Sequence, residues 1–375
     1  MTDRSTEIAT YHLTSESISA TARHFNLTRG SVKDQLARAS RHGIAPGLVA
    51  APGVPGYQMG KTTVQYDADG KIVTEWRRLY PEAENIEAWV SSLEERVAGK
   101  APKIKAPART DGDLMLEIAI GDHHLGMLSW PEETGEGPYD SKIAVDLLVG
   151  AVGSVIKGCE KPDKIVLAVL GDFFHADSRV AQTEKSKAPL DVDSRFCKRM
   201  DMGRDAMCEC IELAAAAAKE VEVIIISGNH DYHSAKMLQR ILAAYYRNDK
   251  RITVRTNPRL RQYLQWGKVM LGYAHGDTVK TGKWALSFPV EAPDIWAATE
   301  FRYGRQGHFH TRSTEEFPGL VVETLPILAA PDAWTVDSGY HSRRAITAYM
   351  WSKRYGLRAK MERGVQEILD YIKSK

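Results

Sequence analysis

Five polar clusters in the chain combine glycine with aspartate, asparagine or histidine. They are Gly-Asp-His-His at 121–124, Gly-Asp-Phe-Phe-His at 171–175, Gly-Asn-His-Asp at 228–231, His-Gly-Asp at 275–277 and Gly-His-Phe-His at 307–310. Aspartate, asparagine and histidine supply the oxygen and imidazole ligands that divalent transition metals favour. Glycine lets the backbone turn sharply and approach a ligand closely. One such cluster is typical of an ordinary turn, whereas five together indicate a metal centre.

Short apolar segments lead into these clusters and predict the strands that position them. The segments that end at a polar, glycine-containing turn are 114–120, 165–170 and 221–226, with helices predicted at 143–156 and 197–220. Further strands are expected at 252–255, 269–273, 321–325 and 346–351, then a return at 357–363 and a final short helix. This alternation is typical of an α/β fold. Such sheets place ligands at the carboxyl ends of their strands, where the clusters would gather.

The five clusters, in this order, resemble the motifs of the calcineurin-like metallophosphoesterase family. The resemblance covers residues 114–351 and is carried by Asp122-x-His124, Gly171-Asp172, Gly228-Asn229-His230-Asp231, His275 and Gly307-His308-x-His310. It implies a four-layer α/β/β/α domain that holds two divalent metal ions. By this likeness the first ion is held by Asp122, His124 and His310. The second is held by Asn229, His275 and His308, and Asp172 bridges both.

The charge balance of such a site favours phosphate chemistry. Two divalent ions bring four positive charges, and Asp122 and Asp172 neutralise only two, because the other ligands are neutral imidazoles and an amide. A hydroxide that bridges the metals would attack phosphorus, so no serine or cysteine nucleophile is needed. Mn²⁺ is the expected ion because the ligands mix imidazole with carboxylate and amide oxygens. Zn²⁺, Fe and Mg²⁺ are alternatives.

Three further residues are expected to act beside the metals. His230 follows a ligand without being one, so we expect it to stabilise the transition state or to protonate the leaving oxygen. Asp231 would orient the His230 imidazole or, alternatively, cap the helix that follows. The segment around His175 resembles the Gly-Asp-Leu-Phe-His element of the SbcD-type DNA repair nucleases, in which the histidine contacts substrate phosphate. A buried structural histidine is the alternative, and residues 176–187 depart from the nuclease pattern. His123 is expected to pack or to support a ligand.

The N-terminal residues predict a small helical unit. Two short helices within 15–42, separated by a break before Thr28, resemble a helix-turn-helix of the kind found at the front of phage-encoded proteins. On that interpretation Thr28 caps the second helix. The side chains offered to DNA would be Arg29, Ser31, Lys33, Gln35 and Arg38. A helical hairpin used for oligomerisation is the alternative.

Shifts in composition divide the chain into four parts. Residues 1–43 form the helix-turn-helix region, and 44–97 hold a Pro/Gly-rich linker, a β-hairpin around 67–70 and an amphipathic helix at 84–97. Residues 98–112, rich in Ala, Lys and Pro, are predicted to be the main interdomain linker. Residues 113–375 form the predicted phosphoesterase domain.

Charge and composition set the expected surroundings of the protein. The 50 basic and 48 acidic residues give a net charge of +2, so any DNA-binding surface must be local. Residues 247–261 hold six arginines and lysines against one aspartate, and we expect Arg251 and Arg255 among them to contact a phosphate backbone. No apolar run approaches the ~18 residues of a membrane span. Four cysteines form no disulfide framework. A cytoplasmic protein without a membrane partner is expected, in a bacterial host's cytoplasm if it is phage-encoded.

The sequence therefore predicts a metal-dependent hydrolase of DNA phosphodiesters. The nearest alternative is a small-substrate phosphatase or cyclic-nucleotide phosphodiesterase. Another is a DNA-binding regulator or scaffold with a vestigial catalytic domain. The sequence leaves open exonuclease or endonuclease action, a homo-oligomer and a partner ATPase of the kind that SbcD-type enzymes use.

Overall fold

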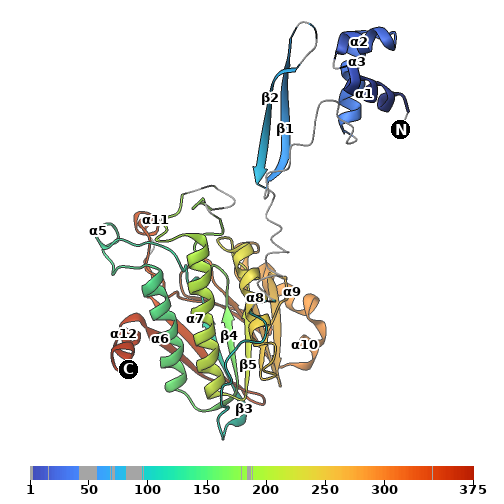
Figure 1. Ribbon diagram of the computed structural model, residues 1–375. Helices are drawn as coiled ribbons and strands as arrows, with labels where there is room; N and C mark the ends of the chain where they lie inside the picture. The colour runs from blue at the N-terminus through green and yellow to red at the C-terminus, as the bar shows by residue number, and fades with distance from the viewer. Residues whose placement is uncertain are drawn as a thin grey trace. The chain divides into compact units, whose positions relative to one another are not determined.

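The computed structural model describes most of the chain. The described residues are 3–15, 17–41, 57–67, 69, 72–81, 95, 97–178, 180–183, 187, 189–339 and 341–375. The chain divides into two compact units, Met1–Trp89 and Val90–Lys375 (Figure 1). Residues 44–56 of the predicted linker at 44–57, and most of the predicted helix at 84–97, lie outside the described residues.

The described residues of the first unit form three helices and a β-hairpin. The helices are α1 (Asp3–Ser15), α2 (Ile18–His24) and α3 (Arg29–Arg41), and their apolar core consists of Ile8, Ile18, Ala22 and Val32. The prediction omitted α1, whose contribution to this core is Ile8. The Thr28 hydroxyl accepts the N–H of Ser31 at 3.1 Å, so the predicted cap of α3 is present. Strands β1 (Tyr57–Tyr66) and β2 (Ile72–Pro81) pair antiparallel.

The second unit is built on a six-stranded sheet. Its strands are β3 (Asp111–Ile120), β4 (Pro162–Val169), β5 (Glu220–Ile225), β6 (Ile252–Val254), β12 (Ala345–Ser352) and β13 (Gly356–Gly364), in the order β13-β12-β3-β4-β5-β6. Strands β3 to β6 are parallel, and β12 and β13 add an antiparallel edge. The inner residues of β3, β4 and β5 are buried on both faces, which explains why these strands read as mostly apolar segments, with Glu117 and Glu222 as the charged exceptions.

A five-stranded sheet packs against the first. Its strands are β7 (Arg261–Trp266), β8 (Val269–Ala274), β9 (Phe301–Gln306), β10 (Ser313–Phe317) and β11 (Leu320–Thr324), in the order β10-β11-β9-β8-β7. Strands β8, β9 and β11 are parallel to one another. Leu170, Ile226, Leu271 and Trp351 belong to the apolar cluster shared by the two sheets.

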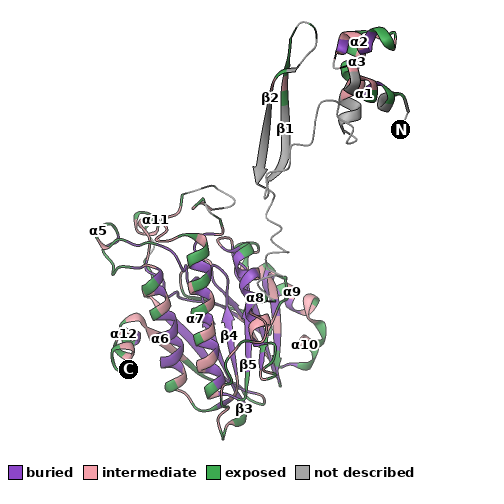
Figure 2. Cartoon of the chain, in the orientation of Figure 1, coloured by how far each residue is buried: buried purple, intermediate pink, exposed green. Residues whose placement is uncertain are grey.

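Helices cover the outer face of each sheet. Those on the six-stranded sheet are α6 (Ser141–Lys157), α7 (Phe196–Ala217), α8 (Tyr232–Tyr246) and α12 (Val365–Lys373), and those on the other sheet are α9 (Thr281–Glu291) and α10 (Pro293–Ala298). Short helices α5 (Pro131–Thr134) and α11 (Ala333–Asp337) contact each other. Burial is concentrated on the strands and on the helix faces turned toward them (Figure 2). This arrangement is the four-layer α/β/β/α architecture that was predicted.

The predicted linker at 98–112 is part of the second unit. Val97, Ala101 and Ile104 pack against the core beneath the helices, and the Gly99 N–H donates to the Ala244 carbonyl at 2.8 Å. Up to the start of β3 at Asp111 the segment is neither helix nor strand, which explains its lack of apolar periodicity, and single apolar side chains anchor it. Its role as the interdomain linker stays a prediction.

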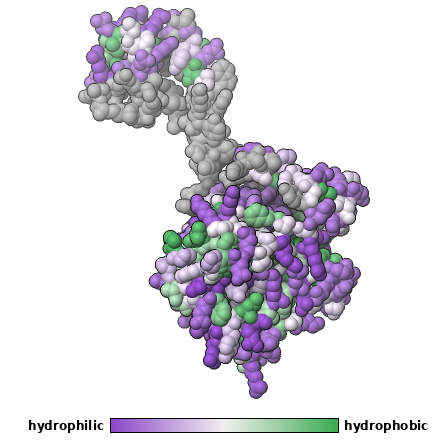
Figure 3. All heavy atoms as spheres, turned by 180° about the vertical axis from the view of Figure 1, so that it is seen from behind, coloured by the Kyte–Doolittle hydropathy of each residue, from purple (hydrophilic) through white to green (hydrophobic). Residues whose placement is uncertain are grey.

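None of the described helices is both long enough and apolar enough to span a membrane. On the face shown in Figure 3, hydrophobic residues are scattered among hydrophilic ones.

A charged side chain is buried between the sheets. Arg305 of β9 is fully buried, and its guanidinium lies 3.0 Å from Glu323, 3.6 Å from Glu117 and 3.8 Å from the centre of the Tyr349 ring. The Trp351 indole also donates to Glu117 at 2.8 Å. Burial raises the pKa of Glu117, and Arg305 opposes that rise. Each charge in this core depends on its partner.

We predict that Arg305→Leu destabilises the second unit by about 3–5 kcal/mol, because it leaves Glu117 buried without its partner. Denaturant unfolding measures the change, with Arg358→Leu on the exposed face of β13 as the control. The loss relative to wild type should shrink as the pH is lowered, since a protonated Glu117 no longer needs the guanidinium. Equal unfolding midpoints for the two variants would show that the buried pair does not stabilise the fold.

Candidate metal centre

The five clusters follow the carboxyl ends of five strands, three in one sheet and two in the other. Asp122 follows β3, Asp172 follows β4, Asn229 follows β5, His275 follows β8 and His308 follows β9. Strands β3, β4 and β5 are parallel, and so are β8 and β9, so each set of strand ends lies at one edge of its sheet. Side chains far apart in sequence therefore meet at one place.

Two groups of potential ligands form there. In the first, ligand atoms of Asp122, His124 and His310 lie within 4.8 Å of one another, and in the second the same holds for Asp172, His275 and His308. The groups adjoin, because Asp122 Oδ1 lies 3.8 Å from His275 Nδ1. Each group offers one carboxylate and two imidazoles, a donor set suited to a divalent transition metal.

The second group also includes Asn229. His275 Nδ1 donates to the Leu170 carbonyl at 2.9 Å, which directs Nε2 into the site. Asn229 Oδ1 and Asp172 Oδ2 both lie 3.1 Å from this Nε2. Three electron-pair donors thus converge. The structure brings together all seven residues predicted as metal ligands, and their binding of metal stays a prediction.

The two aspartates need compensation by positive charge. Asp122 and Asp172 are buried, and within the described part of the chain histidines alone form ion pairs with them. Burial opposes protonation of His275, but Asp172 and Asp122 outweigh it and raise the pKa of His275 to about 10. Burial likewise opposes protonation of His310, and Asp122 raises its pKa. Divalent cations would supply the same compensation with neutral imidazoles as ligands, so the residues present fit two metal ions.

His124 is held in the state that a metal ligand requires. Burial and the neighbouring His230 and His310 rings lower the pKa of His124 well below its ordinary value. Its Nε2 faces His310 Nε2 at 3.1 Å. A neutral imidazole with a free lone pair is the form that binds metal.

Backbone strain is concentrated at the ligands. His124, Asp172, His308 and His310 have φ values of 48°, 48°, 68° and 53°. Left-handed backbone costs a non-glycine residue on the order of 1–2 kcal/mol, and such strain clusters at functional sites. Four of the six described non-glycine residues with positive φ are predicted metal ligands, so folding holds these side chains in place against a local cost.

Two glycines make room for the carboxylates. A Cβ on Gly228 would overlap Asp172 Oδ1, and a Cβ on Gly307 would overlap Asp122 Oδ2. The close backbone approach expected from the sequence is therefore present at both aspartates.

Asp231 has neither of the roles weighed from the sequence. Its buried carboxylate accepts N–H groups from Gly228 (2.8 Å), Asp172 (3.2 Å), Phe173 (2.8 Å) and Phe174 (3.3 Å). Burial and the charge of Asp172 raise the pKa of Asp231 to about 7, and the Gly228 N–H opposes the rise. Asp231 stands at the N-cap position of α8 without making a side-chain cap bond. It fixes the turn that carries Asp172.

Asp177 caps α8 in place of Asp231. Its carboxylate accepts the N–H groups of His233 at 2.7 Å and Ser234 at 2.8 Å. Asp177, which follows β4, thus binds backbone N–H groups after β5, and Asp231, which follows β5, binds backbone N–H groups after β4. Each turn therefore holds the other in place. Sequence analysis did not identify Asp177. A carboxylate that caps a helix more than fifty residues away leaves no local sequence pattern at either position.

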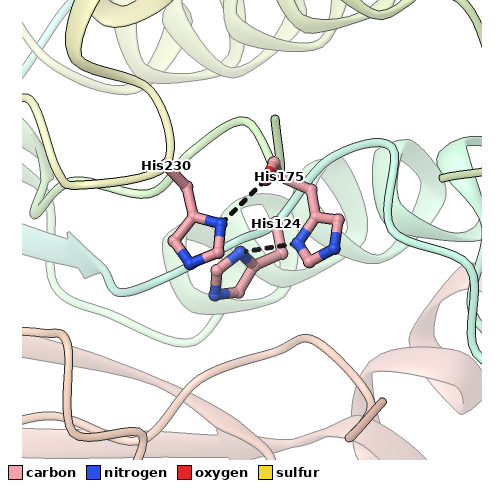
Figure 4. Close-up of side chains that lie close together, drawn as sticks. All are labelled: His124, His175 and His230. Atoms are coloured by element: carbon pink, nitrogen blue, oxygen red, sulfur yellow. Dashed lines mark hydrogen bonds between the residues drawn. The ribbon is translucent and has the colours of Figure 1, made fainter. Parts of the chain in front are cut away.

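His124, His175 and His230 form a trio beside the first group (Figure 4). His175 Nδ1 lies 3.2 Å from His124 Nδ1, and the His175 carbonyl accepts the His230 Nδ1 proton at 2.8 Å. The ring of His230 lies 5.0 Å from that of His124. His175 is only 2% exposed, and burial lowers its pKa to about 3. Its burial favours the structural alternative, and the contact with substrate phosphate implied by the nuclease resemblance stays a prediction.

His123 packs inside the fold. It is fully buried with a pKa lowered to about 3 by burial, and its ring lies 5.3 Å from that of Phe173. The Tyr139 hydroxyl donates to its carbonyl at 2.6 Å. The packing role expected for His123 agrees with this environment.

The basic run at 247–261 is divided between the two ends of the six-stranded sheet. Arg251 precedes β6, at the end opposite the metal ligands, and donates to the Ala215 and Ile104 carbonyls at 3.1 and 2.7 Å. Arg255 follows β6 and bonds Glu222 at 2.5 Å and the Tyr263 carbonyl at 2.8 Å. Arg251 thus supports the fold away from the site, whereas Arg255 lies at the site end.

A hollow of about 290 Å³ opens at that site end. Its lining includes Arg255, Asn257, Arg259, Arg261 and Glu291. Arg261 pairs with Ala274, the residue before His275, and bonds Glu291 at 2.8 Å, while Arg259 is exposed. The hollow therefore lies at the end of the five-stranded sheet where His275 follows β8.

The predicted DNA-reading side chains of α3 differ in exposure. Arg29 and Lys33 are exposed, and Ser31 and Gln35 are half-buried. Ser31 Oγ lies 2.8 Å from the capping Thr28 hydroxyl. The side chain of Arg38 lies outside the described residues.

No protein-family model matches the sequence, and no curated protein matches it. Among solved structures, the chain is similar to a predicted phosphoesterase from Streptococcus pneumoniae (11% identity, 67% of this chain and 98% of that chain, TM-score 0.29). It is also similar to Vps29 from Entamoeba histolytica complexed with Zn²⁺ (13%, 67% and 99%, TM-score 0.27) and to an archaeal phosphodiesterase (10%, 67% and 99%, TM-score 0.33). At these values the assignment of the site rests on its own geometry.

We predict that Gly228→Ala weakens metal binding by about 10- to 100-fold, because the added methyl group displaces the Asp172 carboxylate. The measurement is Mn²⁺ bound per chain across a titration. Gly112→Ala is the matched control, since nothing lies within 4 Å of a Cβ at that position. Unchanged Mn²⁺ affinity in Gly228→Ala would show that the position of Asp172 does not matter for metal binding.

Proposed function

We propose that the protein is a metal-dependent phosphodiesterase that uses two divalent ions and acts on DNA. The observation that carries the proposal is the pair of adjoining groups, each with one carboxylate and two imidazoles, at the carboxyl ends of β3, β4, β8 and β9. Two cations bound there would lower the pKa of a coordinated water and neutralise charge on a phosphate. Mn²⁺ fits the mixed nitrogen and oxygen donors.

His230 is the residue proposed to handle the leaving-group proton. Its Nδ1–H is committed to the His175 carbonyl, which leaves Nε2 for substrate. The side chain is half-buried and lies beside His124 without belonging to either carboxylate-containing group. A proton carried at Nε2 would pass to the leaving oxygen. His175 would act through His124 and His230 as a positioning residue, and Asp231 would hold the turn of Asp172.

A DNA substrate is supported by the surroundings of the site. The hollow lined by Arg255, Arg259 and Arg261 lies at the sheet end where β8 leads into His275. Arg255 and Arg261 are paired with Glu222 and Glu291, so the exposed Arg259 is the guanidinium proposed to meet a phosphate backbone. In the first unit, α3 presents exposed Arg29 and Lys33, as a DNA-contacting helix would. A small-substrate phosphatase would use neither feature.

We predict that His310→Ala and His230→Ala fail in different ways. His310→Ala removes a ligand, so it should lose both bound Mn²⁺ and hydrolysis of bis-p-nitrophenyl phosphate. His230→Ala should keep its Mn²⁺ and lose about 10²- to 10⁴-fold in kcat, the usual contribution of a proton-transferring residue. Metal analysis and steady-state kinetics on the same preparations separate the two. Full activity in His310→Ala would contradict the dimetal proposal, and loss of Mn²⁺ in His230→Ala would make that residue a ligand.

We predict that Arg259→Ala weakens DNA binding and reduces the salt dependence of binding by about one phosphate contact. Binding of labelled single- and double-stranded DNA at several salt concentrations, with Mn²⁺, measures both. Arg247→Ala is the control, because Arg247 is also exposed and belongs to the same basic run but precedes β6 at the far end. If wild-type protein consumes a mononucleotide and leaves DNA intact, the substrate is a small phosphoester instead.

A further inference from the structure

Phe309 is an apolar side chain in the middle of the metal centre. It stands between His308 and His310, whose ligand atoms belong to different groups. Its neighbours in the chain are half-buried, whereas Phe309 is 49% exposed. Core packing therefore does not account for a phenylalanine at this position.

The turn around Phe309 fixes the side chain. The backbone is left-handed at His308 and at His310, and the Phe309 N–H donates to the Gly307 carbonyl at 2.8 Å. The Phe309 ring lies 5.2 Å from the His308 ring, at an interplanar angle of 73°. A Cβ on Gly276 would lie 3.4 Å from Phe309 Cε2, so one edge of the ring lies against the Gly276 backbone. The ring is thus held beside the ligands with much of its surface open to solvent.

We propose that Phe309 is a specificity-determining residue that stacks on a nucleobase of the substrate. This inference rests on the proposed phosphodiesterase function. A phosphate bound across both ligand groups would lie near the Phe309 ring, which packs 5.2 Å from the His308 ring, so a substituent of that phosphate could contact it. Bases stack on exposed aromatic side chains in a sequence-tolerant way. The substrate class is therefore a phosphodiester that carries a nucleoside next to the cleaved bond.

Two synthetic diesters with the same leaving group test the proposal. Thymidine 5′-(p-nitrophenyl phosphate) and methyl p-nitrophenyl phosphate both release p-nitrophenolate, and the first carries a nucleoside where the second carries a methyl group, so the change that Phe309 variants make in the preference reports the contact with the base. The wild-type protein with Mn²⁺ should prefer the thymidine ester in kcat/KM. Phe309→Leu should reduce that preference by roughly 5- to 100-fold, mainly through KM, the range expected for one lost base–aromatic stack. Phe309→Trp should retain it.

The matched control is Tyr355→Leu. Tyr355 is 60% exposed and follows β12, whose carboxyl end lies opposite the site because β12 runs antiparallel to β3. This variant should keep the wild-type preference. Bound Mn²⁺ in Phe309→Leu reports whether the ligand turn is intact.

Several outcomes would overturn the inference. If Phe309→Leu prefers the thymidine ester as strongly as the wild-type protein does, Phe309 does not stack on the base. An equal loss of activity on both esters, with reduced Mn²⁺, would make Phe309 a support of the ligand turn. If the wild-type protein hydrolyses neither ester with Mn²⁺, the proposed phosphodiesterase function itself fails.

Discussion

The structure depends on the burial of two carboxylates at the ends of neighbouring strands. Asp122 and Asp172 lie where two sheets meet, and histidines alone pair with them among the described residues. Buried charge without compensation is too costly for a marginally stable fold. Two sources of positive charge can compensate the aspartates: protonated histidines, or metal ions bound by the aspartates and neutral histidines together. Metal binding would leave the histidines neutral and place positive charge where a phosphate can reach it.

The fold holds this arrangement through features that would be unfavourable elsewhere. Four ligands adopt left-handed backbone, and Gly228 and Gly307 leave no space for a side chain beside the carboxylates. Asp231 and Asp177 each cross to the other's turn and satisfy its backbone N–H groups. These contacts restrict where the ligand side chains can lie. The same restriction keeps Phe309 beside the ligands with much of its ring in solvent.

Several elements were predictable because buried strands consist mainly of apolar residues, which are visible in the sequence. The parallel strands β3, β4 and β5 each contain a mostly apolar, buried segment, and the glycine-containing clusters that follow them marked the site. Strand β9 was not predicted, since its buried face carries Arg305, whose partners Glu117 and Glu323 come from distant strands. Strand β10 was missed because its residues are largely exposed and polar. The role of Asp231 depends on backbone N–H groups of another turn, which no local pattern records.

The proposed metal centre needs seven side chains to hold two divalent ions side by side. Anomalous diffraction from crystals of the full chain grown with Mn²⁺ tests this most directly. We expect two peaks, one among Asp122, His124 and His310 and the other among Asn229, His275 and His308, with Asp172 in contact with both. Crystals that show no manganese among these residues, or ions bound by other side chains, would contradict it.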